Sequence, residues 1–130
     1  MTTSIVTKST PVLIVESVAP CAEFWERLGF TRVAEVPHDH SIGFVILSDG
    51  NLEIMYQSMA SVIDDDASIA EVLTTGGSSL FVEVSNIADA LKAVADAKVI
   101  LKERTTFYGM REVGVLDPGG NVVIFAQKVE

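Results

Sequence analysis

Basic side chains are absent from nearly half of this sequence. Residues 33–91 contain no lysine or arginine but hold ten aspartate and glutamate residues, and the whole chain has a formal net charge of −9. Proteins that bind nucleic acid or anionic membranes use clusters of lysine and arginine for this. We therefore expect neither kind of partner, and a cationic or neutral ligand suits the charge better than an anion. Acidity that serves only solubility is the alternative explanation.

Cysteines and long hydrophobic runs are also scarce. The single cysteine, Cys21, cannot form a disulfide within the chain, and no histidine lies near it in the sequence to activate it as a nucleophile. No apolar run has the length of a membrane span, and the first ten residues, MTTSIVTKST, lack the apolar core of a secretion signal. These absences lead us to expect a cytoplasmic protein.

An internal repeat organises the residues that are present. The segment DGNLEIMYQ, which begins at Asp49, resembles GGNVVIFAQ, which begins at Gly119, at an offset of 70 residues. TPVLIVESVA, from Thr10, resembles SLFVEVSNIA, from Ser79, at an offset of 69. Two matches at nearly one offset indicate two copies of one structural unit.

Each copy has the pattern of one strand, one helix and three further strands. We expect a single domain over residues 1–130, made of module one at about 8–58, a linker at 59–77 and module two at about 78–128. Runs rich in β-branched residues predict strands at 12–15, 30–37, 42–48, 51–57, 80–84, 99–106, 110–116 and 121–127. Ser17 and Asn86 can cap the two helices. In the linker, Asp64, Asp65 and Asp66 are expected at the start of a short helix at 68–73.

This order of elements and two motifs resemble a known family. FWERLGF, from Phe24, ends the first helix, and YGMREVGVLDPGGN, from Tyr108, leads into the last strand. Both are similar to segments of the vicinal oxygen chelate superfamily, which includes glyoxalase I, bleomycin-resistance proteins, fosfomycin-resistance enzymes and extradiol dioxygenases. The resemblance implies an α+β fold in which curled mixed sheets form a cup, with helices on the convex side. It also implies a small-molecule ligand in the cup and a homodimer.

The metal centre of that family has no counterpart in this sequence. Members that bind a metal take ligands, mostly histidine and glutamate, from the starts of the first and fifth strands and from within the fourth and eighth. The resemblance places Thr10, Ser79 and Ile124 at three of these positions, and either Glu53 or Ile54 at the remaining one. Two hydroxyls and an isoleucine cannot complete a site for a divalent ion. We therefore expect no metal and no cofactor.

Two histidines raise the question of a different metal site. His38 and His40 would share one face of a strand, because side chains alternate along it. They would need at least one more ligand, and Asp39 between them would point the other way. A solvated turn is the favoured alternative.

Without a metal, ligand binding has to depend on other polar and aromatic groups. In LEIMYQ, alternation places Glu53 and Met55 on the face opposite Ile54 and Tyr56, so Glu53 faces the cup if the apolar set packs on a helix. The candidate ligand-binding residues are Glu53, Met55, Phe81, Glu83, Tyr108, Met110 and Arg111. Arg111 would pair with Glu53 or with a ligand carboxylate, unless it is an ordinary cation at the edge of a strand. Exposure of both glutamates at the rim is a further alternative, and no catalytic residue is assigned.

These features predict a binding protein of the bleomycin-resistance type, which sequesters a cationic or aromatic molecule without a metal and so confers antibiotic resistance. The alternative is an enzyme of the same superfamily: a glyoxalase-like lyase, an isomerase, a thiol transferase or a dioxygenase. Glu53 is the only support for an enzyme in the sequence. Because this fold hosts both classes, the resemblance alone does not choose between them.

Overall fold

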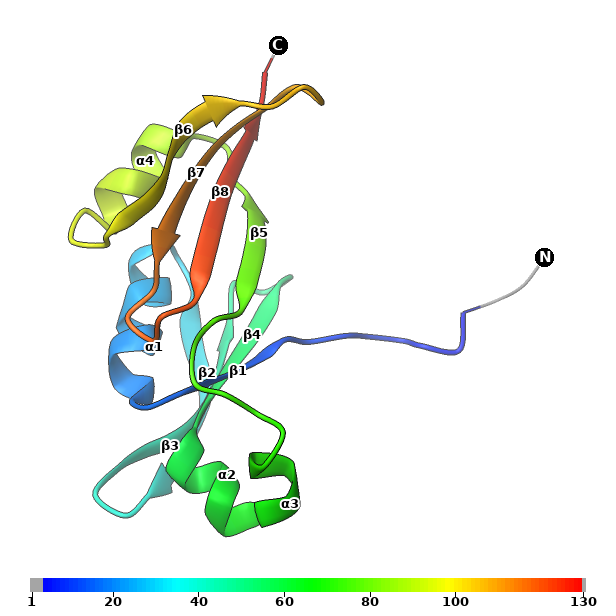
Figure 1. The fold of residues 1–130 in the computed structure, drawn as a ribbon, viewed down its shortest axis with the longest axis vertical. Coiled ribbons are helices and arrows are strands. Elements are labelled where there is room, and N and C mark those ends of the chain that lie inside the picture. Colours follow the sequence, from blue (N-terminus) through cyan, green and yellow to red (C-terminus); the bar gives the residue numbers. More distant parts are fainter. Residues whose placement is uncertain (1–3, 130) are drawn as a thin grey trace.

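Two four-stranded mixed sheets, each with a helix packed on one face, make up the protein (Figure 1). The computed structural model describes residues 4–129. The first sheet and its helix comprise β1 (Val12–Val15), α1 (Val18–Arg27), β2 (Thr31–His38), β3 (Ser41–Ser48) and β4 (Glu53–Ser58). The second comprises β5 (Ser79–Glu83), α4 (Ile87–Ala93), β6 (Val99–Thr105), β7 (Met110–Leu116) and β8 (Val122–Lys128). Between them lie α2 (Met59–Asp65) and α3 (Ala67–Ala70).

The two sheets share one topology. Their strand orders are β1-β4-β3-β2 and β5-β8-β7-β6, and in each the first strand runs parallel to its neighbour while the remaining pairs are antiparallel. The predicted α+β fold of two βαβββ modules is therefore confirmed. None of the helices within residues 4–129 is long and apolar enough to cross a membrane.

Alternation along the strands gives each sheet a packed face and an open face. On β4, Ile54 and Tyr56 are buried in the core beneath α1, and on β8 Val123 and Phe125 are buried in the same core. Burial of one such apolar side chain contributes about 1.5–3 kcal/mol. The opposite, open faces expose apolar side chains, including Phe81, which is 51% exposed.

The linker contains more helix than the sequence predicts. The helix α2 was not predicted; it begins after Ser58, whose hydroxyl accepts a hydrogen bond from the Ser61 N–H at 3.2 Å. The predicted helix at 68–73 is shorter and begins one residue earlier, as α3. Of the three aspartates expected at its start, only Asp66 is there, capping the Ser68 N–H at 2.9 Å. Asp64 and Asp65 instead end α2, so their predicted position is wrong.

The two predicted helix caps differ in how they work. Asn86 accepts a hydrogen bond from the Asp89 N–H at 2.9 Å, which satisfies a free donor in the first turn of α4. Ser17 occupies the N-cap position of α1, but its side chain makes no capping hydrogen bond. The sequence therefore predicted the start of both helices, but the predicted capping hydrogen bond is present only in α4.

The strand pairing settles which residue of β4 corresponds to Ile124 of β8. Val12 pairs with Met55 in the first sheet and Phe81 pairs with Ile124 in the second. Phe81 lies 69 residues after Val12, and Ile124 lies 69 residues after Met55. Met55 is therefore the counterpart of Ile124. The alternative that placed Ile54 there is wrong, because Ile54 is buried on the packed face. Glu53 lies on the open face with Met55, since side chains two residues apart share a face.

The DPGG turn between β7 and β8 ties the two modules together. Asp117 accepts hydrogen bonds from the backbone N–H groups of Gly119 at 2.9 Å and Asn121 at 2.8 Å. Its second oxygen accepts a bond from the Tyr56 hydroxyl at 2.6 Å, and that hydroxyl accepts one from the Trp25 indole N–H at 2.8 Å. Burial and the negative charge of Asp117 raise the pKa of Tyr56, so the phenol keeps its proton and donates it. The DPGGN motif therefore has a structural role.

Candidate functional site

A cavity of about 490 Å³ lies where the first module meets the edge strand β5 of the second. Its floor is apolar and consists of side chains from the packed faces: Trp25, Phe30, Ile54, Leu80 and Val82. Its rim is polar and carries charge of both signs, from Lys8, Glu53 and Glu83, and Phe81 also lines it. An apolar enclosure with a few converging polar groups is the usual form of a small-molecule site.

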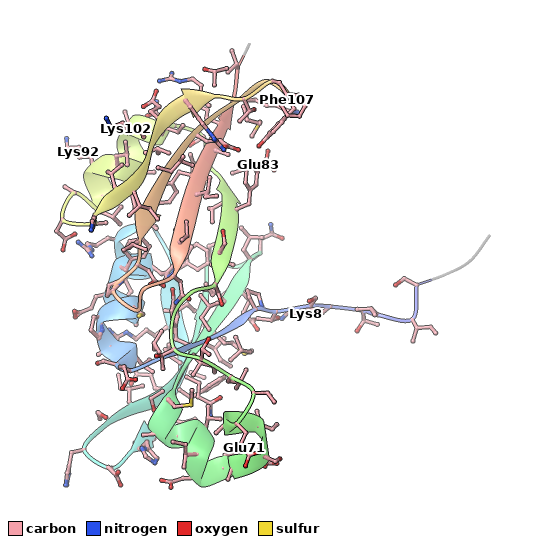
Figure 2. All side chains as sticks on the ribbon, viewed as in Figure 1. Lys8, Glu71, Glu83, Lys92, Lys102 and Phe107 are labelled. Carbon is pink, nitrogen blue, oxygen red and sulfur yellow. The ribbon has the colours of Figure 1, made fainter. Side chains whose placement is uncertain are left out.

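Glu53 is the most enclosed carboxylate of this rim. Its side chain is 23% exposed, and its Oε2 atom lies 3.2 Å from the Lys8 ammonium group. Lys8 belongs to the segment that precedes β1, and Figure 2 shows it where this segment reaches the body of the protein. The cavity therefore contains an ion pair formed by residues 45 positions apart in the sequence.

Glu83 and Phe81 supply the second side of the rim. They share the open face of β5, since they lie two residues apart on that strand. Glu83 makes no ion pair within residues 4–129, so its carboxylate is available to a ligand. Phe81 exposes about half of its surface beside it and offers a ring face for stacking.

Only three of the seven predicted ligand-binding residues line this cavity, namely Glu53, Phe81 and Glu83. Met55 lies on the open face of β4, two residues beyond Glu53, and Met110 is buried at the start of β7. Tyr108 lies in the turn before β7, where it is half-exposed. These three residues do not line the cavity of a single chain.

Arg111 lies on the other face of the second sheet. On β7 it shares the packed face with Val113 and Val115, which are buried in the core. Its guanidinium pairs with the Glu103 carboxylate. It therefore does not pair with Glu53, as the sequence interpretation had considered. The cavity of one chain contains no place for Arg111.

A buried carboxylate that sequence reasoning missed lies on the open face of β7. Glu112 is 2% exposed; it accepts hydrogen bonds from Arg104 at 3.2 and 3.3 Å and from the Tyr108 hydroxyl at 2.5 Å. The bond to Glu112 raises the pKa of Tyr108, so this phenol also stays protonated. Strand alternation could have identified Glu112, because residues 110 and 112 lie on the same face of β7 and Arg111 lies on the opposite face.

The predicted histidine pair forms no metal site. His38 Nε2 lies 2.6 Å from an Asp64 oxygen and links the end of β2 to α2. Nowhere in residues 4–129 do three or more histidine, cysteine, aspartate or glutamate side chains gather as a set that could hold a metal ion. Of the residues that the resemblance places at the family's metal positions, Thr10 and Ser79 offer only hydroxyls, the register of β4 brings Met55 opposite to the place of Ile124, and the neighbouring Glu53 carboxylate already faces Lys8. These residues do not fit a divalent metal.

A larger hollow, of about 680 Å³, lies on the outer side of α1. Its lining comprises Pro20, Glu23, Glu26, Arg27, Asp96 and Pro118. Arg27 and Asp96 pair with each other across it at 2.6 Å. It has no apolar floor, so it lacks the enclosure that binds a small molecule, and the smaller cavity is the better candidate site.

Several solved structures have the same fold at low sequence identity. A protein from the mobile metagenome of V. Pseudocholerae has a TM-score of 0.72 at 20% identity, with 100% of both chains covered. A glyoxalase/bleomycin resistance protein/dioxygenase from Nocardioides has a TM-score of 0.73 at 16% identity, covering 99% of this chain and 87% of the other. A bleomycin-binding protein complexed with bleomycin has a TM-score of 0.64 at 19% identity, covering 95% and 99%.

No curated protein matches the sequence of this chain. The family described as the Glyoxalase/Bleomycin resistance protein/Dioxygenase superfamily matches residues 8–125, which is nearly the whole chain. The repeated βαβββ topology agrees with this match. This chain therefore belongs to the Glyoxalase/Bleomycin resistance protein/Dioxygenase superfamily.

Proposed function

We propose that this protein binds and sequesters a cationic, partly aromatic small molecule, without a metal. The observation that carries the proposal is the cavity of about 490 Å³, whose apolar floor is rimmed by Glu53, Glu83 and Phe81. A planar cation would place its ring on Phe81 and the apolar floor, and its charge near the carboxylates. The likeness to a bleomycin-binding protein supports this kind of ligand, and bleomycin is a reasonable compound to test.

The charge of the chain favours the same class of ligand. Module one and the linker contain most of the carboxylates, and residues 33–91 contain no lysine or arginine. A concave site in such surroundings attracts cations, and this attraction weakens as salt is added. A hydrogen bond to a charged group contributes about 1.5–3 kcal/mol. Because Glu53 already pairs with Lys8 and Glu83 is exposed, we expect the lower end of this range at each carboxylate.

Calorimetry with three matched compounds tests the proposal. These are 4-aminoquinoline, which is a cation at neutral pH, neutral quinoline and anionic quinoline-2-carboxylate; bleomycin is titrated in parallel. We expect the cation to bind tightest and the anion weakest. Glu53→Gln and Glu83→Gln should each weaken the cation by about tenfold, equivalent to about 1.4 kcal/mol, and change quinoline much less.

The matched control is Glu71→Gln, which removes the same charge at an exposed position outside the cavity (Figure 2). It should change binding only through the overall field, and so by less than the cavity variants. Tighter binding of quinoline-2-carboxylate than of 4-aminoquinoline would contradict the proposal. That result would favour an enzyme of the transferase kind instead.

We also propose that the chain forms a homodimer. The open sheet faces expose apolar side chains, among them Val12, Val36 and Phe81, and the segment before β1 exposes Ile5 and Val6. A second copy would cover such surfaces by burying apolar area. Light scattering at micromolar concentration should report about twice the chain mass of 13.9 kDa. A stable monomer would contradict this proposal and would leave the single-chain cavity as the binding site.

A further inference from the structure

The segment that precedes β1 touches the cavity through a few residues only. Ile5 is 96% exposed and Val6 is 69% exposed, whereas residues 8–11 line the cavity. The Met55 N–H donates a backbone hydrogen bond to the Pro11 carbonyl at 3.0 Å, which holds the end of the segment beside β4. The Lys8 side chain, by contrast, is 62% exposed while it pairs with Glu53. Lys8 can therefore leave Glu53 without uncovering any of the core.

We infer that Lys8 is a built-in competitor for cationic ligands: its ammonium group occupies Glu53 until a ligand cation displaces it. This inference rests on the function proposed above and extends it to the residue that sets affinity and charge selectivity. The Nζ atom lies 3.2 Å from Glu53 Oε2, so it occupies the place beside this oxygen that a ligand ammonium or amidinium would take at about 2.7–2.9 Å. Two cations cannot share one face of this carboxylate without repelling each other, so binding of a cation exchanges one ion pair for another.

The exchange affects ligands of different charge in different ways. A neutral ring can rest on the apolar floor and on Phe81 without disturbing Lys8. A cation gains Glu53 only by breaking the existing pair. Pairs as exposed as this one are weak in water, so removal of the competitor should tighten cation binding by about two- to fivefold. Lys8 therefore lowers the affinity for cations while leaving that for neutral molecules nearly unchanged.

Substitution of Lys8 gives the first test. In Lys8→Gln, 4-aminoquinoline should bind about two- to fivefold more tightly than in the wild type, and quinoline should bind equally well. The control is Lys102→Gln, which removes the same charge at an exposed position on β6 (Figure 2). In a Glu53→Gln background, Lys8→Gln should have no effect beyond that of Lys102→Gln. An unchanged or weakened affinity in Lys8→Gln would overturn the inference.

Cleavage by lysyl endopeptidase gives a second test, which needs no ligand. The enzyme cuts after lysine, and a free Lys8 side chain should be bound by it more readily than one paired with Glu53. Glu53→Gln should therefore be cut after Lys8 about two- to fivefold faster than the wild type, and Glu71→Gln at the wild-type rate. Mass spectrometry of the products identifies this cut among any others. Equal rates in Glu53→Gln and in the wild type would overturn the inference.

The same cleavage assay in the presence of ligand distinguishes a ligand that displaces Lys8 from one that covers Lys8. If the cation displaces Lys8, saturating 4-aminoquinoline should speed the cut in the wild type towards the Glu53→Gln rate, whereas quinoline should not. A slower cut with the cation would mean that the ligand covers Lys8, which contradicts displacement. If no cationic compound binds at all, the proposed function fails, and the cleavage rates without ligand still decide whether Lys8 occupies Glu53.

Discussion

Removal of one buried hydroxyl should destabilise the whole protein. Tyr56 is fully buried; its hydroxyl donates to Asp117 at 2.6 Å and accepts from the Trp25 indole N–H at 2.8 Å. Tyr56→Phe leaves the indole donor without an acceptor, and leaves this oxygen of Asp117 with only the Asn121 amide at 3.2 Å. An unsatisfied buried donor costs about 1–3 kcal/mol and a bond to a charged group is worth about 1.5–3 kcal/mol. Since phenylalanine regains part of this as an apolar side chain, we expect a net loss of about 3 kcal/mol.

Urea and thermal unfolding of the wild type and variant measure this loss. For a chain of this length, about 3 kcal/mol corresponds to a decrease in Tm of about 10 °C. Tyr108→Phe is the matched control, because it removes a hydroxyl that also donates to a carboxylate, but from a half-exposed residue. It should cost about 1–2 kcal/mol, less than Tyr56→Phe, because the buried Glu112 carboxylate keeps its bonds from Arg104 and no buried donor is left unpaired. A Tyr56→Phe loss no larger than that of the control would refute the reasoning.

Three further outcomes follow from the core and from the donor set of the cavity. Burial, and secondly the charge of Asp117, raises the pKa of Cys21 from 9.0 to about 12. At pH 8 the native protein should therefore react with a thiol reagent about a thousandfold more slowly than the unfolded protein. Because the unfolded chain loses this proton first, the stability should fall as the pH rises from about 9 to 12. A labelling rate equal to that of the unfolded chain would contradict this. Gly119→Ala should cost about 1–3 kcal/mol in urea unfolding, because the new Cβ would lie 2.3 Å from Val15 Cγ1; the cost should shrink when Val15→Ala makes room. Protein purified without a histidine tag should hold well under one equivalent of zinc, nickel, manganese or iron, and stoichiometric metal after mild chelation would disprove this.

The sequence was most informative where local patterns decide the structure. The strands at 12–15 and 110–116 have the predicted bounds, because β-branched runs between turn residues depend little on distant contacts. The helix α2 was missed because MASVIDD has no apolar stripe and buries only Val62. Its start depends on the Ser58 cap, which resembles any other serine at the end of a strand.

The candidate site was harder to predict, because it depends on pairing between distant segments. A slip of one residue moves every side chain of a strand to the other face, and only the strand pairing shows that Met55, rather than Glu53 or Ile54, is the counterpart of Ile124. The prediction also placed both Met110 and Arg111 at the ligand, although neighbouring residues of a strand point to opposite faces. Nothing in MTTSIVTKST indicates that Lys8 lies beside Glu53, since that contact joins a segment without periodicity to a distant strand.

The hydrogen bonds behind the cavity explain how two modules can form one site. Trp25 lies in the cavity floor and donates to Tyr56, which in turn donates to Asp117 in the turn between β7 and β8. This chain of bonds fixes module one to module two directly behind the cavity, so the distance between Glu53 on β4 and Phe81 on β5 is set before a ligand arrives. The two segments around Trp25 and Asp117 thus hold the modules in place. The rim residues that we propose contact the ligand, Glu53, Phe81 and Glu83, lie outside these segments. Solved structures at 16–20% identity share the fold, and a shared fold does not by itself determine the ligand.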